Sequence, residues 1–224
     1  MGISLSSIFG SASIGVFSLL TDQLFIAPSV APEARIRRLS EGLKVKPVFT
    51  TIGYSLLIGA LACANSKGII LPSYTLDEEI EPIRAAAGDA NIAVMDTKRT
   101  AYGNMVLAND YGAIADPRLQ PETLKQISET LCVEVVPGEI ARLPYVGSLA
   151  VATNKGVLAH PLIKEDEQAL LKDVLRVPLE VGTVNCGIPY VGTGLLGNSY
   201  GAVVGLLTTG PELFIVENAL ELVD

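Results

Sequence analysis

Residues 102–117 read YGNMVLANDYGAIADP, and the same order of residue types recurs four more times along the chain. Each copy begins with an apolar residue and a glycine, continues with a short apolar run and ends in a polar turn. The first glycines of successive copies are separated by 44, 44, 44 and 45 residues. These marker glycines are Gly15, Gly59, Gly103, Gly147 and Gly192. Repetition at a period of about 20–50 residues is typical of solenoids, propellers and arrays. The sequence therefore predicts one structural unit copied five times.

A polar tetrad follows the apolar run in every copy, and it has the composition of a β-turn. Asn or Thr opens the tetrad, and glycine closes it in four of the five copies, whereas Leu24 closes the first. The opening side chain can accept a hydrogen bond from the backbone two residues later, and glycine tolerates the left-handed conformation that follows a type I turn. We expect each tetrad to join two antiparallel strands. The tetrads are residues 21–24, 65–68, 109–112, 153–156 and 198–201.

A helix is predicted after each of these hairpins, and a further strand after four of the helices. Proline or an acidic residue opens most of the helical stretches, which suits a first helical turn. The predicted helices are residues 32–43, 76–87, 121–131, 165–175 and 211–220. The predicted third strands are residues 44–50, 92–96, 133–136 and 177–181. One repeat is thus expected to read strand, strand, helix, strand.

The fifth copy ends just after its helix and lacks a third strand, whereas residues 3–9 precede the first copy without an assignment. We expect this N-terminal segment to supply the missing strand, because closing a ring removes exposed strand edges. The prediction is a single α/β domain over residues 1–224, with five repeats of about 44 residues closed into a ring. The approximate repeat bounds are 13–51, 52–100, 101–143, 144–187 and 188–224, with residues 1–12 completing the last.

The segments YGNMVLANDYG, VGSLAVATNKGVLAHP and VPLEVGTVN, with the later TTGPEL, resemble the archaeal translation initiation factor 6 family of ribosome anti-association factors. The resemblance covers the chain from about residue 14 onward. It implies the pentein fold, a five-bladed pseudo-symmetric α/β propeller, in agreement with the repeat count. It also implies binding to the intersubunit face of the large ribosomal subunit, near ribosomal protein uL14 and the sarcin–ricin loop, where the bound propeller would block the small subunit.

Composition predicts a soluble, intracellular protein that binds protein more than nucleic acid, and we expect it to be a cytoplasmic monomer. Lys and Arg number 16 and Asp and Glu 24, giving a net charge of −8. This balance argues against a bulk electrostatic grip on DNA or RNA, and no unbroken apolar stretch of about 20 residues suggests a membrane partner. One basic cluster, either a solvated helix face or an RNA-facing patch, consists of Arg35, Arg37 and Arg38 with Lys44 and Lys46 after them.

An enzymatic alternative comes from other penteins, which attack guanidino groups with a cysteine assisted by histidine and carboxylates. The candidates here are Cys186 and the single histidine, His160. His160 fills a position that other copies give to Ala27, Leu71 and Asp116, which favours a structural role. Cys63 and Cys132 lie in apolar runs and are expected to be buried. No zinc pattern or phosphate-binding loop is present, so we expect no catalytic residues, no metal and no cofactor.

The third copy differs most from its siblings and is the predicted ribosome-binding element. Asn104 is the one large amide directly after a marker glycine, and Asp110 stands where the second and fifth copies have serine. Loop tips often carry binding residues, and the same motif in the family faces the large subunit. We expect one patch on a strand and its turn, formed by Asn104, Asn109, Asp110 and Tyr111. The alternatives are turn formation for Asn109 and a strand-edge hydrogen bond for Asn104.

Overall fold

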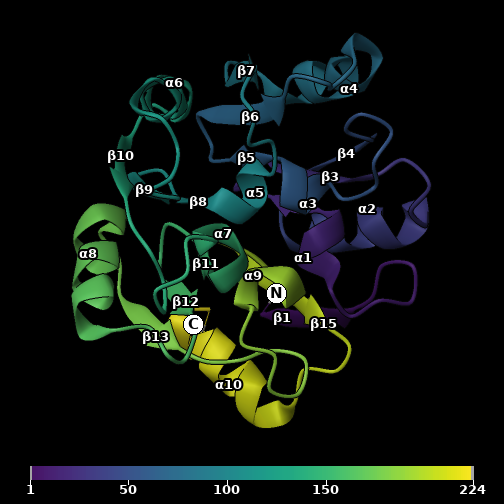
Figure 1. Ribbon diagram of the computed structural model, residues 1–224. Coiled ribbons are helices and arrows are strands. Elements are labelled where there is room, and N and C mark those ends of the chain that lie inside the picture. Colours follow the sequence, from purple (N-terminus) through teal and green to yellow (C-terminus); the bar gives the residue numbers. More distant parts are fainter. Residues whose placement is uncertain (1, 223–224) are drawn as a thin grey trace.

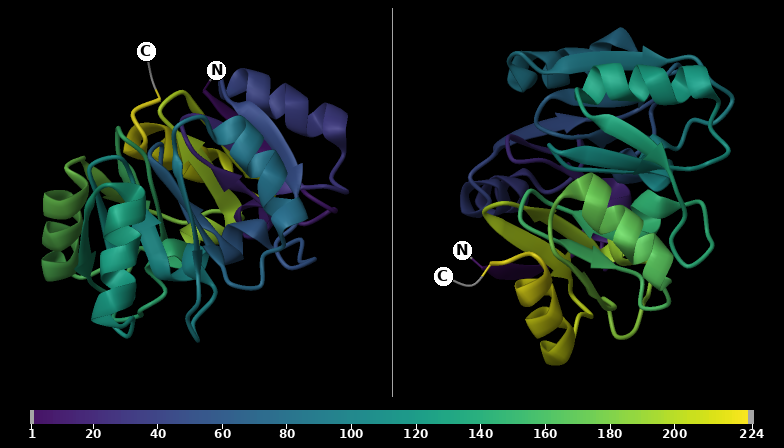
Figure 2. Two further views of the ribbon diagram at one scale, coloured as in Figure 1. Left: turned by 90° about the horizontal axis from the view of Figure 1, so that it is seen from above. Right: turned by 90° about the vertical axis from the view of Figure 1, so that its left-hand side faces the viewer.

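Five three-stranded sheets stand around a common axis in the computed structural model, which describes residues 2–222 (Figure 1). In each sheet the middle strand pairs antiparallel with one neighbour and parallel with the other. The five long helices lie on the outside of the ring, as the views in Figure 2 also show. The predicted α/β fold with five pseudo-symmetric repeats is confirmed.

The first four repeats have the order short helix, strand, strand, long helix, strand, and the fifth ends with its long helix. The first repeat contains α1 (Ile14–Phe17), β2 (Leu19–Leu20), β3 (Leu24–Pro28), α2 (Glu33–Gly42) and β4 (Lys46–Thr50). The second contains α3 (Ile58–Leu61), β5 (Cys63–Ala64), β6 (Gly68–Pro72), α4 (Asp77–Ala87) and β7 (Asn91–Met95). The third contains α5 (Tyr102–Met105), β8 (Val106–Ala108), β9 (Gly112–Ala115), α6 (Pro121–Leu131) and β10 (Glu134–Pro137). The fourth contains α7 (Val146–Leu149), β11 (Ala150–Ala152), β12 (Val157–Ala159), α8 (Glu165–Leu175) and β13 (Leu179–Val181). The fifth contains α9 (Val191–Gly194), β14 (Leu195–Asn198), β15 (Gly201–Gly205) and α10 (Gly210–Ala219).

The N-terminal strand β1 (Ile3–Ser6) completes the fifth sheet, as the sequence predicted. It pairs parallel with β15, with Ile3 opposite Ala202 and Ser6 opposite Gly205. In the other four sheets a strand from the end of the same repeat takes this place. The first strand of the chain therefore closes the ring on its last sheet.

The marker glycines lie in one-turn helices and not at the start of strands, which corrects the predicted repeat order. These short helices, α1, α3, α5, α7 and α9, gather around the axis in Figure 1. Each marker glycine packs on the carbonyl oxygen of its predecessor so closely that a Cβ atom would lie 1.9–2.1 Å from that oxygen. The relation is cyclic, since Gly15 packs on Gly192. Only glycine fits such an approach, so the five glycines define the width of the ring centre.

Within the part of the chain that the structure describes, the hydrophobic core consists of five clusters, and each cluster spans two neighbouring repeats. One combines Leu107 and Ile114 of the third repeat with Leu171 and Leu175 of α8 in the fourth. Another combines Leu196 of the fifth repeat with Phe25 of the first. Because the apolar surface of each repeat is buried partly by the next one, the repeats stabilise one another around the ring. Among the described residues, no helix combines the length and apolar character needed to cross a membrane.

Candidate functional site

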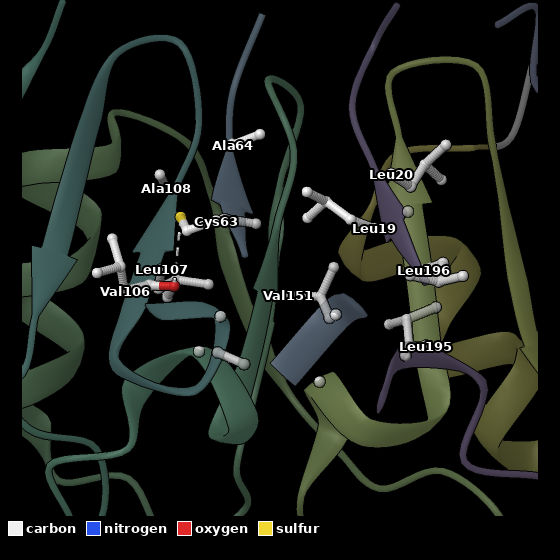
Figure 3. A pocket seen from close by; sticks show the side chains of 18 of the residues that line it. Leu19, Leu20, Cys63, Ala64, Val106, Leu107, Ala108, Val151, Leu195 and Leu196 are labelled. Atoms are coloured by element: carbon white, nitrogen blue, oxygen red, sulfur yellow. Dashed lines mark hydrogen bonds between the residues drawn. The ribbon is translucent and has the colours of Figure 1, made fainter. Parts of the chain in front are cut away.

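A narrow channel along the axis separates two ends of the ring. At one end lie the marker glycines and the short helices, and we call it the glycine end. At the other lie the five tetrads, and we call it the turn end. The main space between them has a volume of about 100 Å³ and is lined by apolar side chains such as Leu107, Val151 and Leu196 (Figure 3). Pockets for ordinary small-molecule ligands occupy roughly 300–1,000 Å³, so this space is too small for such a ligand. The two end surfaces are candidate binding regions.

Asn109 has a structural role at the turn end, in agreement with the turn-forming alternative. It is 4% exposed. Its Oδ1 accepts hydrogen bonds from the backbone N–H groups of Tyr111 at 3.0 Å and Gly112 at 3.1 Å. Its Nδ2 donates to the carbonyl oxygens of Thr153 at 3.0 Å and Leu175 at 2.8 Å. Both amide atoms are thus engaged within the protein, and Asn109 fixes the loop tip on which Asp110 and Tyr111 lie.

Asp110 belongs to a hydrogen-bonded belt of side chains around the axis at the turn end. Its Oδ1 accepts from the Ser66 N–H at 2.8 Å, and its Oδ2 accepts from Asn154 Nδ2 at 2.7 Å. Asp22 occupies the equivalent position in the first repeat and accepts from the same Asn154 Nδ2 at 2.9 Å. An acidic residue at this position is therefore not unique to the third repeat. The carboxylate of Asp110 stabilises contacts between neighbouring repeats. Tyr111, next to it, is exposed.

Asn104 lies in α5 at the glycine end, so the prediction of a strand-edge hydrogen bond for it is wrong. Its Oδ1 accepts a hydrogen bond from Ser148 Oγ in the neighbouring short helix at 3.0 Å. Strand β8 runs between Asn104 and the tetrad that contains Asp110. The single patch expected from the sequence is thus two separate locations, at opposite ends of the channel.

The short helices at the glycine end and the loops that precede them carry several exposed aromatic and large aliphatic side chains. Tyr145 and Tyr190 are N-cap residues of α7 and α9, and each is 44% exposed. Further exposed side chains of this group are Phe9, Tyr54, Leu57 and Ile188. The turn end contributes Tyr111 and Tyr200. Extended exposed apolar patches mark interaction sites. The sequence analysis did not identify these positions, although the N-cap tyrosines stand two residues before marker glycines.

Three glutamates hold the loops at the glycine end, of which Glu79 and Glu212 are buried and Glu167 is partly buried. Glu79 accepts hydrogen bonds from the backbone N–H groups of Gly53 and Tyr54, and also from Leu76 at the start of its own helix. Glu167 and Glu212 do the same for the loops at residues 140–143 and 184–188. The loops that carry exposed side chains are therefore pre-organised, which lowers the entropy lost on binding.

The hydrogen bonds of Glu212 also change its acidity. Burial raises the pKa of its carboxyl group, but the hydrogen bonds from Thr209, Gly187 and Thr183 outweigh burial and bring the pKa down to about 2. Glu79 behaves alike: burial acts to raise its pKa, and hydrogen bonds from Leu76, Thr51, Tyr54 and Gly53 lower it overall. Both groups are consequently charged at neutral pH and act as loop anchors.

His160 does not have the environment of a catalytic base. It is buried, and its Nδ1 accepts a hydrogen bond from the backbone N–H of Leu162 at 3.1 Å. Asp116, its counterpart in the third repeat, accepts in the same way from the Arg118 N–H at 2.8 Å. Burial lowers the pKa of His160, against an opposing effect of Glu167. The shared geometry supports the structural interpretation that its repeat position suggested.

The three cysteines have different surroundings. Cys186 is exposed, and its backbone N–H is bonded to Glu212. Cys63 is buried as expected, and burial raises the pKa of its thiol to about 12. Cys132 is exposed in a left-handed conformation after α6, so the prediction that it is buried is wrong. Within residues 2–222 no group of three His, Cys, Asp or Glu side chains is arranged to hold a metal ion.

The predicted basic cluster is divided by the fold. Arg35 donates to the Ser7 carbonyl oxygen at 3.0 Å, and Arg37 forms an ion pair with Glu33 at 2.6 Å. Lys44 and Lys46 instead line a groove at the turn end, together with Lys67 of the second repeat. The arginines and the lysines therefore do not form one patch.

Comparison with known proteins identifies relatives over nearly the whole chain. A family model described as the eIF-6 family matches residues 3–219. The protein named Translation initiation factor 6 from Methanocaldococcus jannaschii is 43% identical over 219 residues, which cover 96% of each chain. Proteins of the same name from Pyrococcus horikoshii and Staphylothermus marinus are 42% and 39% identical, over 94% and 96% of this chain and 94% and 95% of their own.

Proposed function

Because the chain belongs to the eIF-6 family, we propose that it binds the intersubunit face of the large ribosomal subunit and so keeps the small subunit from joining. The observation that carries the proposal is the match over residues 3–219, with relatives named Translation initiation factor 6 along nearly their full length. These names support a role in translation and favour a factor over an enzyme. The protein would act in the cytoplasm as a monomer, without a cofactor.

We place the ribosomal contact at the glycine end. The exposed Tyr145 and Tyr190 there supply aromatic anchors of the kind that dominate protein interfaces. Asn104 lies among the same short helices and offers an amide within reach of a partner. The glutamate-held loops keep this surface rigid. A net charge of −8 complements a basic ribosomal protein, and uL14, with the sarcin–ricin loop nearby, is the proposed partner.

The mechanism needs occupancy alone. A specific protein interface buries roughly 1,200–2,000 Å², and one end of the ring can supply its share of such an area. The rest of the ring then occupies space that the small subunit needs. Binding excludes joining, and release restores it, without a bond made or broken in the protein.

The four residues predicted from the third copy enter this proposal differently. Asn104 is a candidate contact. Asn109 positions the loop tip, and Asp110 and Tyr111 lie at the opposite end, which a single end-on contact does not include. Their direct binding to the ribosome stays a prediction, and the choice between the two ends is open to experiment.

Sedimentation of archaeal ribosomal subunits with the protein tests both points. We expect co-migration with the large subunit alone and loss of joined ribosomes. Tyr190→Ala at the glycine end should weaken co-migration at least tenfold, and Asn104→Ser should weaken it in the same direction. Tyr111→Ala is the matched control, because Tyr111 and Tyr190 are both 44% exposed but lie at opposite ends. A reversed order of the two tyrosine variants would place the contact at the turn end, and no co-migration of the unmodified protein would refute the function.

A further inference from the structure

Most neighbouring repeats are joined at the turn end by an asparagine. Asn65 Nδ2 donates to the Leu131 carbonyl oxygen at the end of α6 at 2.9 Å. Asn109 makes the same contact to Leu175 of α8 at 2.8 Å, and Asn198 makes it to Leu43 after α2 at 3.0 Å. Each bond ties the turn of one repeat to the long helix of the next. We call such a contact an asparagine staple.

The glycine that closes the tetrad brings the same surfaces together. A Cβ atom on Gly68 would lie 2.0 Å from the Thr130 carbonyl oxygen of α6. On Gly112 it would lie 2.2 Å from that of Val174, and on Gly156 it would lie 1.9 Å from that of Ala219. The backbone of the turn therefore lies directly against the backbone of the next helix at these three positions.

Both features are replaced between the first and second repeats. Thr21 stands in place of the asparagine, and its hydroxyl accepts from the N–H groups of its own turn, at Gln23 and Leu24. Leu24 stands in place of the glycine and packs in the core with Ile83 and Ala87 of α4. The turn thus stands away from the end of α4. A groove of about 860 Å³ opens there, between residues 22–23, residues 44–46 and residues 86–91.

Three lysines from two segments line this groove, although the chain as a whole is acidic. They are Lys44, Lys46 and Lys67. Lys67 Nζ is held by the Asp110 carbonyl oxygen at 3.0 Å, and Lys44 Nζ lies 5.2 Å from the centre of the Tyr200 ring. Among the ion pairs of residues 2–222, none involves these three ammonium groups. An incoming anion would therefore not have to displace an internal carboxylate.

The two acidic residues that line the groove oppose this charge only in part. Asp22 Oδ1 accepts from the Ser199 N–H at 2.7 Å, and its Oδ2 accepts from Ser199 Oγ and Asn154 Nδ2. Its carboxylate is therefore directed into the belt around the axis. Asp89, after α4, is the other acid. Ser66, Gln23 and Asn91 add neutral polar groups along the groove.

We propose that this groove binds the phosphodiester backbone of an RNA strand. Three lysine ammonium groups, two from residues 44–46 and one from the second repeat, suit a series of phosphates, which they contact as point charges. The choice of RNA over an acidic peptide rests on the proposed function, since a translation factor works among ribosomal RNA. The site lies at the turn end, so it would be a second contact in addition to the glycine end.

Fluorescence anisotropy with a labelled single-stranded RNA of about ten nucleotides tests the inference without ribosomes. We expect salt-sensitive binding, with a slope of log K against log salt of about −2 for three phosphate contacts on a single strand. Lys46→Glu should raise the Kd at least tenfold and reduce the slope by about 0.7. Lys172→Glu, at an exposed position of α8 in the fourth repeat, changes the net charge equally and should leave the Kd nearly unchanged.

Equal effects of the two variants, or no RNA binding at about 50 mM salt, would overturn the proposal. Labelled polyglutamate is the second arm, and its binding in place of RNA would overturn the assignment of the ligand. Circular dichroism melting of each variant separates loss of the site from loss of the fold. Because the assay contains no ribosome, its failure and the failure of large-subunit binding are independent results.

Discussion

Gly103 lies against Gly59 so closely that a Cβ atom on Gly103 would be 1.9 Å from the Gly59 carbonyl oxygen. Gly147 has the same relation to Gly103, and the series returns through Gly192 and Gly15 to Gly59. The glycine repeat is therefore a packing requirement of the ring centre. None of the five has a left-handed φ, so the requirement concerns space and not backbone conformation.

Gly103→Ala should destabilise the protein by about 3 kcal/mol or more, because the backbone of α5 must move away from α3 to admit a methyl group. For a chain of this size that corresponds to a fall in Tm of roughly 6–12 °C. Gly210→Ala is the control, since a Cβ atom there meets nothing within 4 Å. Thermal melting followed by circular dichroism measures both. Similar Tm values for the two variants would show that the ring centre relaxes easily.

Asn109→Asp should cost at least about 2 kcal/mol at neutral pH. The carboxylate can still accept from the Tyr111 and Gly112 N–H groups, but it cannot donate to the carbonyl oxygens of Thr153 and Leu175. Two buried acceptors would lose their donor and face a negative charge. Asn91→Asp is the matched control, because exposed Asn91 also donates to a carbonyl oxygen, that of Thr130. Urea unfolding measures the free energy of unfolding of both variants. Equal losses would contradict the stabilising role of the Asn109 staple.

Glu212 should make stability depend on pH in the acid range. Its folded-state pKa of about 2 lies below the ordinary value of 4.5. A lowered folded-state pKa contributes stability that is present above pH 4.5 and is lost as the pH falls toward 2. Glu212→Gln should therefore lower the Tm clearly at pH 7 and much less at pH 2.5. Glu122→Gln, in the exposed first turn of α6, is the control and should show no such difference. A constant effect of Glu212→Gln across pH would contradict the role of its charge.

The long helices could be predicted closely because their information is local. The predicted bounds of α6 and α8 agree with the structure, at residues 121–131 and 165–175. Acidic residues open α8, and Leu171, Val174 and Leu175 recur on its buried face. The short helices escaped prediction because four residues make a single turn, which is too short to show a helical period. The spacing of the glycines predicted the five repeats. The missing third strand of the fifth copy, together with the unassigned N-terminal segment, predicted that the repeats close into a ring.

The candidate site was less accessible to sequence reasoning, because its contacts join residues that are far apart in the chain. Asn109 and Leu175 are separated by 66 residues, and Asp22 and Asn154 by 132. Differences between the copies singled out Asn104 as the one large amide at its position, whereas Asp110 shares its charge with Asp22 of the first repeat. They did not show that β8 separates Asn104 from Asp110, because a four-residue helix has no detectable period and Asn104 was therefore assigned to the strand. The sequence showed that Thr21 and Leu24 stand where other repeats have asparagine and glycine. It did not show that a groove would form there, because the groove also depends on the position of the end of α4 in the second repeat.

Removal of residues 1–7 should destabilise the whole ring and not only its fifth sheet. The deletion takes away β1, exposes the edge of β15 and removes the acceptor that Arg35 reaches at Ser7. Exposed apolar surface costs roughly 25 cal/mol per Å², so several kcal/mol would be lost from a total of about 5–15 kcal/mol. Because every core cluster spans two repeats, the loss should spread around the ring.

Hydrogen exchange should accelerate in β8 and β9 of the third repeat, far along the chain from the deletion. Leu5→Ser is the control, since Leu5 is 49% exposed and the strand itself remains. Faster exchange confined to β14 and β15, with an unchanged Tm, would show that the fifth sheet unfolds locally and that β1 does not hold the ring together.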